Sequence, residues 1–301
     1  MSRTTRGIAL KLGSTLAFTL QYMSIKLAGD VPVGQVIFFR ALFALIPILI
    51  VMTLTVGLPE GLRTNKPLLH LGRSLIGLTG MFVNFWSVQL LPLADVTGYN
   101  FMQPIFAVIL AALLLKENVG PYRGAAVVLG FVGVLFMLEP HGGLAGILSH
   151  GISGGTGLAL LSALITAFVI IFIRQMSVSE RAETIVFYFM CVCATFGAVS
   201  MLFDHVPLTA EMTLWLVVSG IFGGFGQLGM TFSYRYGEPS LLAPFDYAAM
   251  IWAVLIGLFV FAEIPQTPVL IGSGIVIAAG VFIAWREHRL GREVASRAQS
   301  V

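Results

Sequence analysis

Amide side chains beside a proline are the first residues of this sequence whose types and spacing could do chemistry. Asn100 and Gln103 are three residues apart inside an apolar stretch, so on a helix they lie on one face. Pro104 follows and has no N–H, which leaves the main-chain carbonyl of Asn100 without its helical donor. Two amides and a carbonyl at one level predict a place that can hydrogen-bond a small solute.

A carboxylate occupies the corresponding place in the second half of the chain. Asp246 follows Pro244 in another apolar stretch, and Tyr247 flanks it as Tyr99 flanks Asn100. We expect Asp246 to contact a solute or to carry a coupling proton, and the sequence leaves both roles open. Its structural alternative is to be the partner of an arginine or a tyrosine. The predicted pocket comprises Asn84, Trp86, Tyr99, Asn100, Gln103, Gln227, Tyr234, Asp246 and Tyr247.

Each of these residues has a structural alternative. Asn84 and Gln227 are as well suited to hydrogen bonds between helices as to a pocket. Aromatic side chains also pack in cores or line membrane interfaces. The residues with predicted gating or structural roles are Arg40, Pro104, Pro244, Glu117 and Glu263.

The high apolar content of the sequence indicates that the segments containing these residues lie in a lipid bilayer. Hydrophobic residues make up 57% of the 301 positions, charged residues only 10%, and the mean hydropathy is +0.94. A soluble protein could not bury so much apolar surface, and a disordered chain would be far more polar. The expected fold class is therefore all-α: a polytopic membrane protein with ten transmembrane helices at 7–28, 33–56, 70–91, 95–115, 121–139, 156–175, 183–203, 212–234, 240–262 and 267–285.

Lysine and arginine set the expected orientation. When both termini are placed on one side, all of these residues except Lys26 and Arg40 lie in or beside the loops of that side. The positive-inside rule puts that side in the cytoplasm. The net charge of +3 is not gathered into a basic stripe, so no nucleic-acid partner is expected.

The two halves of the chain are related by an internal repeat. Sliding the second half over the first by 146 residues superimposes two pairs of glycines and a glutamate that ends a span. Each half has an odd number of spans, so the halves lie inverted in the membrane, as in secondary transporters. The matched pairs are Gly77 with Gly223, Gly80 with Gly226 and Glu117 with Glu263, and the expected units are a first repeat at 7–140, a second repeat at 155–286 and a cytoplasmic basic tail at 287–301.

Two segments also carry a resemblance to a known family. The first contains Leu91-Pro-Leu-Ala-Asp-Val, Gln103-Pro-Ile-Phe-Ala-Val-Ile-Leu-Ala and Leu115-Lys-Glu-Asn, and the second runs from Pro239-Ser-Leu-Leu-Ala-Pro-Phe-Asp-Tyr to Phe261-Ala-Glu-Ile-Pro. Both resemble the EamA repeat of the drug/metabolite transporter superfamily. The resemblance implies ten helices with cytoplasmic termini, a location in the cell inner membrane, and transport of a small metabolite without ATP.

Other function classes fit the sequence less well. An intramembrane enzyme would need a nucleophile with its base, paired carboxylates or metal ligands at one depth. The histidines do not provide these groups, because they lie in loops or at span ends without metal-binding spacing. A sensor would need a signalling domain, and an inverted repeat favours a carrier over a channel. The sequence thus predicts no enzyme, no metal and no cofactor; the five histidines are His70, His141, His150, His205 and His288.

The substrate is inferred only from the resemblance. Ala243-Pro-Phe-Asp-Tyr247 and the Gln103-Pro104 region are most similar to the branch that includes riboflavin importers. Aromatic walls with amide and carboxylate partners suit such a planar, partly polar molecule. Carriers of S-adenosylmethionine or amino acids are the alternatives. The predicted partners are thus a small-molecule substrate and the lipid bilayer, and the oligomeric state is left open.

Overall fold

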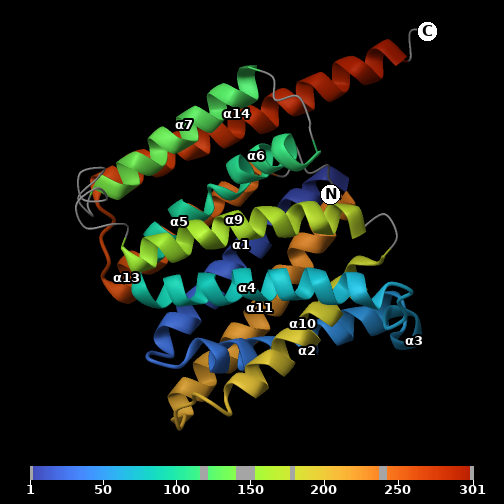
Figure 1. Ribbon diagram of the computed structural model, residues 1–301, viewed down its shortest axis with the longest axis vertical. Coiled ribbons are helices and arrows are strands. Elements are labelled where there is room, and N and C mark those ends of the chain that lie inside the picture. The colour runs from blue at the N-terminus through green and yellow to red at the C-terminus, as the bar shows by residue number, and fades with distance from the viewer. Residues whose placement is uncertain (1–2, 116–120, 140–152, 177–179, 237–242, 299–301) are drawn as a thin grey trace.

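The computed structural model of the chain describes residues 3–115, 121–139, 153–176, 180–236 and 243–298, and these residues form helices without any strand. This confirms the predicted all-α class (Figure 1). The helices of the first half are α1 (Arg3–Leu27), α2 (Val33–Thr55), α3 (Leu58–Gly61), α4 (Pro67–Leu90), α5 (Leu93–Asn100), α6 (Gln103–Leu115) and α7 (Pro121–Leu138). Those of the second half are α9 (Gly154–Met176), α10 (Ala182–Ser200), α11 (Ala210–Tyr236), the 3₁₀ helix η2 (Ala243–Tyr247), α13 (Ala248–Phe261) and α14 (Thr267–Ala298).

Several helices have the length and composition of membrane spans. Within the described residues, three are long and apolar enough to cross a bilayer by themselves: Val33–Thr55, Glu183–Ser200 and Ala210–Met230. Four shorter apolar segments are Val128–Met137, Gly154–Val169, Phe245–Phe261 and Thr267–Ala279. The chain is therefore built as a multi-pass membrane protein.

Two predicted spans are broken rather than continuous. The span expected at 95–115 consists of α5 and α6, separated by Phe101 and Met102. The break precedes the proline because Pro104 is the second residue of α6, and proline is tolerated only in the first turn of a helix. The span expected at 240–262 begins with η2, which contains Pro244, and continues as α13.

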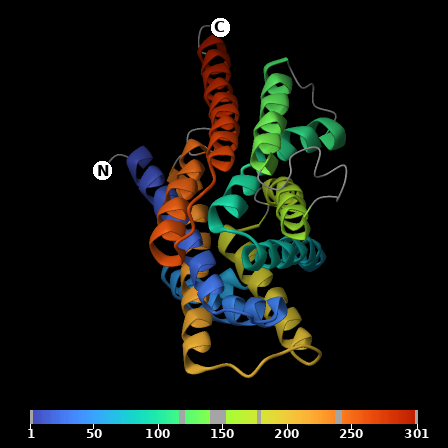
Figure 2. The same cartoon turned by 90° about the vertical axis from the view of Figure 1, so that its left-hand side faces the viewer.

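The last helix is longer than the sequence predicted. The final span was expected to end at residue 285, but α14 continues without interruption to Ala298. Its last part therefore includes most of the expected basic tail, where Arg, Glu, Ala and Leu favour helix. Figure 2 shows this end of α14 projecting beyond the other helices.

The long helices pack in pairs that mostly join the two halves. The most extensive contacts are those of α1 with α11, α4 with α9, α2 with α10 and α7 with α14. α11 also packs on α2, and α10 on α4. In Figure 1 the short helix α3 lies at the right-hand end of the bundle, and the connection from α13 to α14 lies at the opposite end. The core thus depends on contacts between halves more than within them.

Glycines bring some of these helices into backbone contact. At the crossing of α7 and α14, a Cβ atom built on Gly133 would lie 2.7 Å from the Gly272 carbonyl oxygen, and one on Gly272 would overlap the Gly133 carbonyl oxygen. Neither carbonyl can move away without distorting a helix. Close approach through small residues is a common way to pack helices in lipid, where the hydrophobic effect does not drive association.

The α7–α14 crossing provides a stability test. Gly272→Ala should lower the free energy of unfolding by about 1–3 kcal/mol because the new methyl group meets backbone. Gly274→Ala lies in the same helix with nothing within 4 Å of its Cβ position, and should be neutral or stabilising by up to about 1 kcal/mol through helix propensity. Thermal unfolding of the purified protein in detergent compares the two variants. Equal melting temperatures would contradict the described crossing.

Candidate functional site

Two of the predicted polar residues meet across a helix interface. The Asn84 amide of α4 donates from Nδ2 to the Asn100 Oδ1 at 3.3 Å. Asn100 is the last residue of α5 and lies at the break before α6. Asn84 Oδ1 is buried and has no hydrogen-bond partner among the described residues. The pair therefore retains an acceptor that a ligand or a water molecule can use.

A group of residues from α1 and α2 continues this polar region. Tyr22 packs edge-on against Phe85, the neighbour of Asn84, with ring centres 6.4 Å apart. Gln21 Oε1 and Arg40 Nε are both buried, and neither has a partner within the described part of the chain. A Cβ on Gly223 of α11 would touch Gln21 and would lie 3.1 Å from Arg40 Nε. The region therefore lies where α1, α2, α4 and α11 meet.

Arg73 belongs to the same region, although the sequence placed it beside a loop. It is 3% exposed, and its guanidinium carbon lies 4.0 Å from the centre of the Phe189 ring of α10. Arg40, which the sequence did place inside a span, is 4% exposed and donates to the Met190 sulfur at 3.0 Å. The sequence contained the signal for Arg73, since it falls within the predicted span at 70–91.

The other predicted pocket residues are spread over several helices. The Tyr99 hydroxyl donates to the main-chain carbonyl of Met137 at 3.2 Å and so ties α5 to α7. Tyr247 is buried and packs edge-on against Phe101, with ring centres 5.0 Å apart. Trp86 is 45% exposed and packs against Phe82 on the outside of α4. Gln227 is buried and Gln103 is half-buried. Tyr234 lies in α11, Pro104 in α6 and Pro244 in η2. Glu117 is outside the described residues.

Asp246 has a partner that the sequence did not suggest. Its carboxylate Oδ1 lies 2.8 Å from the Lys11 ammonium of α1. The Lys11 side chain is 1% exposed and that of Asp246 is 47% exposed. Lys11 was counted with the cytoplasmic loops, but its position inside the predicted span at 7–28 was a sign that its charge needs a partner within the protein.

A second lysine of α1 makes an ion pair at the other end of the same helix. Lys26 pairs with Glu263 and donates to the Leu91 carbonyl oxygen at 3.2 Å, while Glu263 Oε2 accepts the Leu93 N–H at 3.3 Å. Since Trp252 also donates to Thr15 at 3.3 Å, α1 is joined along its length to the segment made of η2 and α13.

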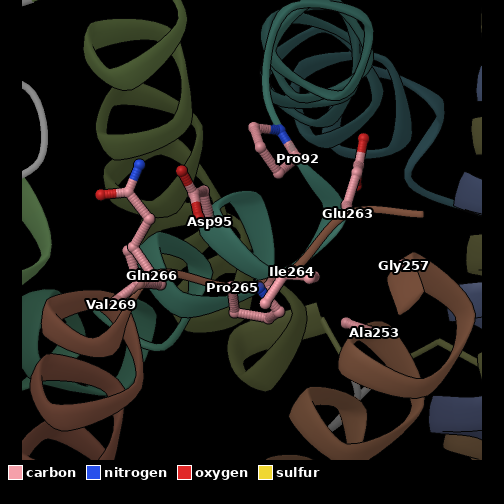
Figure 3. Close-up of a pocket in the computed structure, with 10 residues that line it drawn as sticks. Pro92, Asp95, Ala253, Gly257, Glu263, Ile264, Pro265, Gln266 and Val269 are labelled. Carbon is pink, nitrogen blue, oxygen red and sulfur yellow. The ribbon is translucent and has the colours of Figure 1, made fainter. Parts of the chain in front are cut away.

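A cavity of about 210 Å³ lies beside Glu263 (Figure 3). The carboxylates of Asp95 and Glu263 both line it, together with the Gln266 amide. Ligand pockets for drug-sized molecules usually measure about 300–1,000 Å³, so this cavity is too small for a planar metabolite of several rings. Its remaining lining residues are Pro92, Ala94, Ala253, Gly257, Ile264, Pro265 and Val269.

A further contact between ionisable side chains lies near the start of α4. Nε2 of His70, in α4, lies 3.0 Å from Oε2 of Glu180, which precedes α10. This hydrogen bond, aided by the Lys66 charge, lowers the pKa of the Glu180 carboxyl. The contact joins α4 to the chain just before α10, one helical turn from Arg73.

Two long segments of the sequence, one in each half, match the same known family. Residues 5–139 and 153–285 each match the EamA-like transporter family, and the chain belongs to this family. It is thus a transporter of the membrane rather than an enzyme, as the sequence predicted.

Individual relatives agree with this assignment. The chain is 27% identical over 256 residues to an S-adenosylmethionine uptake transporter of Rickettsia prowazekii, covering 85% of this chain and 84% of that protein. It is 26% identical over 296 residues to a riboflavin transporter of Vibrio cholerae, covering 96% and 94%. A crystal structure with 18% sequence identity has the same fold, with a TM-score of 0.66 over 95% of this chain and 99% of the other.

The ion pair of Lys11 with Asp246 can be tested by removing one or both charges. Asp246→Asn should destabilise the protein by about 1–3 kcal/mol, less than for a fully enclosed pair because Asp246 is half exposed. The double variant Lys11→Met/Asp246→Asn should recover most of this loss, since no charge is then left behind in the helix bundle.

Thermal unfolding of the two variants is the measurement. Glu60→Gln, which breaks the exposed Glu60–Arg63 pair, serves as the control and should change stability by less than about 1 kcal/mol. If the double variant is no more stable than Asp246→Asn alone, the two charges do not depend on one another.

Proposed function

We propose that the chain is a secondary transporter that moves a small metabolite across the inner membrane by alternating access between two inverted five-helix repeats. The observation that carries the proposal is the pairing of the helices. In the repeat, α1, α2, α4 and α7 of the first half correspond to α9, α10, α11 and α14 of the second. Replacing each helix by its equivalent converts the α1–α11 pair into the α9–α4 pair and the α2–α11 pair into the α10–α4 pair, and all four pairs occur. The α2–α10 and α7–α14 pairs are converted into themselves.

Contacts of individual glycines also correspond between the two halves. A Cβ on Gly80 of α4 would lie 3.0 Å from Ile165 of α9, and one on Gly226 of α11 would lie 2.8 Å from Phe18 of α1. Gly80 and Gly226 are equivalent in the repeat, and their partners differ from equivalence by one residue. This agreement supports two structurally similar halves, which is the basis of two alternative packings in carriers.

The broken spans support a binding region near the middle of the membrane. The break at 101–102 corresponds in the repeat to the junction of η2 and α13 at 247–248. Secondary transporters place substrate sites at such discontinuous helices, because the interrupted backbone leaves polar groups available there. Asn100 lies at the first break and Asp246 at the second.

The distribution of basic residues supports cytoplasmic termini. A periplasmic-active reporter fused after His150, which is outside the described residues, should be active, and the same reporter fused after Arg289 should be inactive. A cytoplasmic-active reporter should give the opposite result. If both reporters indicate the same side for the two positions, the halves are not inverted.

Riboflavin is the substrate that the sequence favours, and S-adenosylmethionine is the second candidate. Relatives named as transporters of each compound match the chain over most of its length. The amides of Asn84 and Asn100 can bind ring carbonyls or hydroxyl groups, and the neighbouring rings of Tyr22 and Phe85 can contact a planar ring system.

Counterflow into proteoliposomes tests the function. Proteoliposomes that contain the purified protein and are preloaded with unlabelled riboflavin, S-adenosylmethionine or an aromatic amino acid should accumulate the same compound in labelled form. Asn100→Ala should reduce the affinity about 5- to 150-fold, since a polar group of the bound substrate loses its partner. Repeating the assay of Asp246→Asn with and without a pH gradient separates a coupling role from substrate contact. Failure to exchange any compound would contradict the proposed function.

A further inference from the structure

Two arginines from different helices reach the same part of α10. Arg40 of α2 donates to the Met190 sulfur, and Arg73 of α4 lies over the ring of Phe189, the preceding residue. Phe189 and Met190 are adjacent in sequence and lie within α10. Two cations therefore contact neighbouring residues of one helix inside the bundle.

Both guanidinium groups are enclosed by protein and have only weak partners. Arg40 Nε, Arg73 Nε and Arg73 Nη1 are buried without a hydrogen-bond partner among the described residues. Within those residues, none of the ion pairs includes either arginine. A thioether and an aromatic ring are much weaker partners than carboxylate or phosphate oxygens. The orphaned donors are therefore suited to an acceptor that carries negative charge.

The two arginines approach this site from opposite ends of the bundle. Arg40 is the eighth residue of α2, and Arg73 is the seventh residue of α4. These two helices begin at opposite sides of the membrane in the proposed topology. Phe189 and Met190 are the eighth and ninth of the 19 residues of α10, near the middle of that helix. Carriers with inverted repeats bind their substrates at this level.

Both guanidinium groups pack closely against glycines. A Cβ on Gly77 would lie 3.3 Å from Arg73 Nη1, and a Cβ on Gly223 would lie 3.1 Å from Arg40 Nε. Gly77 and Gly223 are equivalent in the repeat. Each of these orphaned nitrogens thus faces a position where any larger residue would intrude.

We propose that Arg40 and Arg73 form a subsite for an anionic group of the substrate, a carboxylate or a phosphate. This inference rests on the proposed transport function and narrows its substrate class. The planar fork of a guanidinium binds two oxygens of such a group at once. An anion between the two arginines supplies acceptors for the three buried nitrogens and offsets the charge that the described residues leave uncompensated.

The subsite distinguishes between the candidate substrates. S-adenosylmethionine carries a carboxylate that fits the two arginines, with its sulfonium group directed away from them. Riboflavin has no anionic group at neutral pH, whereas its phosphorylated form carries a phosphate. The subsite therefore favours a carboxylate- or phosphate-bearing metabolite over riboflavin itself.

Matched ligands test the subsite on the full-length protein in lipid nanodiscs. S-adenosylmethionine is compared with its decarboxylated form, flavin mononucleotide with riboflavin, and inorganic phosphate with chloride at equal ionic strength. In at least one comparison, the wild-type protein should bind the member with the carboxylate or phosphate group about tenfold or more tightly, because bidentate charge-assisted hydrogen bonds need the oxygens of that group. Dissociation constants from isothermal titration give the ratio.

Variants at the two arginines should remove this preference. In Arg40→Gln and Arg73→Gln the ratio should fall to about twofold or less, whereas Arg63→Gln, at a side chain that is 80% exposed, should keep it. Because the ratio compares two ligands on one protein, lower stability alone does not change it. Where a glutamine variant fails to fold, the lysine variant keeps the charge without the fork and should give an intermediate ratio.

Three results have distinct meanings. Absence of any preference in the wild-type protein, or a preference that persists in both arginine variants, would overturn the subsite. Counterflow without a preference for the anionic ligand would remove the subsite and leave the transport function standing. Anion-selective binding without counterflow would support the subsite and remove the transport function.

Discussion

A charge among membrane helices needs its partner from the protein, because lipid tails can neither hydrogen-bond nor solvate it. This constraint acts most strongly on α1, which carries a lysine towards each end. Lys11 pairs with Asp246 of η2, and Lys26 pairs with Glu263, two residues after the end of α13. The position of α1 is thereby fixed beside η2 and α13. α11 and α4 also pack against α1.

Much of the fold could be predicted from apolar stretches, whereas the charged contacts could not. A run of about twenty apolar residues indicates a span regardless of its neighbours. The partner of Asp246 depends instead on which helices are adjacent, and Lys11 is far from it in sequence. Lys11 and Arg73 lie near span ends, where basic residues usually mark loops, so the positive-inside rule counted them as such. Their positions inside the predicted spans at 7–28 and 70–91 signalled that the charges lie among helices, but their contacts appear only when the helices are packed.

Residues that are adjacent in a predicted pocket can also separate on folding. Tyr99 and Asn100 follow one another in α5, but successive residues point about 100° apart around a helix. Asn100 therefore meets Asn84 of α4, while the Tyr99 hydroxyl reaches a carbonyl of α7. The sequence predicted a polar level in this helix but could not assign directions to its side chains, because these depend on how α5 rotates against its neighbours. The same uncertainty applied to Trp86, which lies on the outside of α4.

The first helix of each half packs mainly on the other half, α1 on α11 and α9 on α4. Neither half is therefore a complete folding unit, since a fragment that ended in the connection at 140–152 would contain α1 and α4 without the helices that cover them. In such a fragment, the faces of α1 and α4 that α11 and α9 cover would be exposed to lipid or would have to find another partner. The two halves therefore depend on one another for a complete core, although two buried arginines, Arg40 and Arg73, both belong to the first.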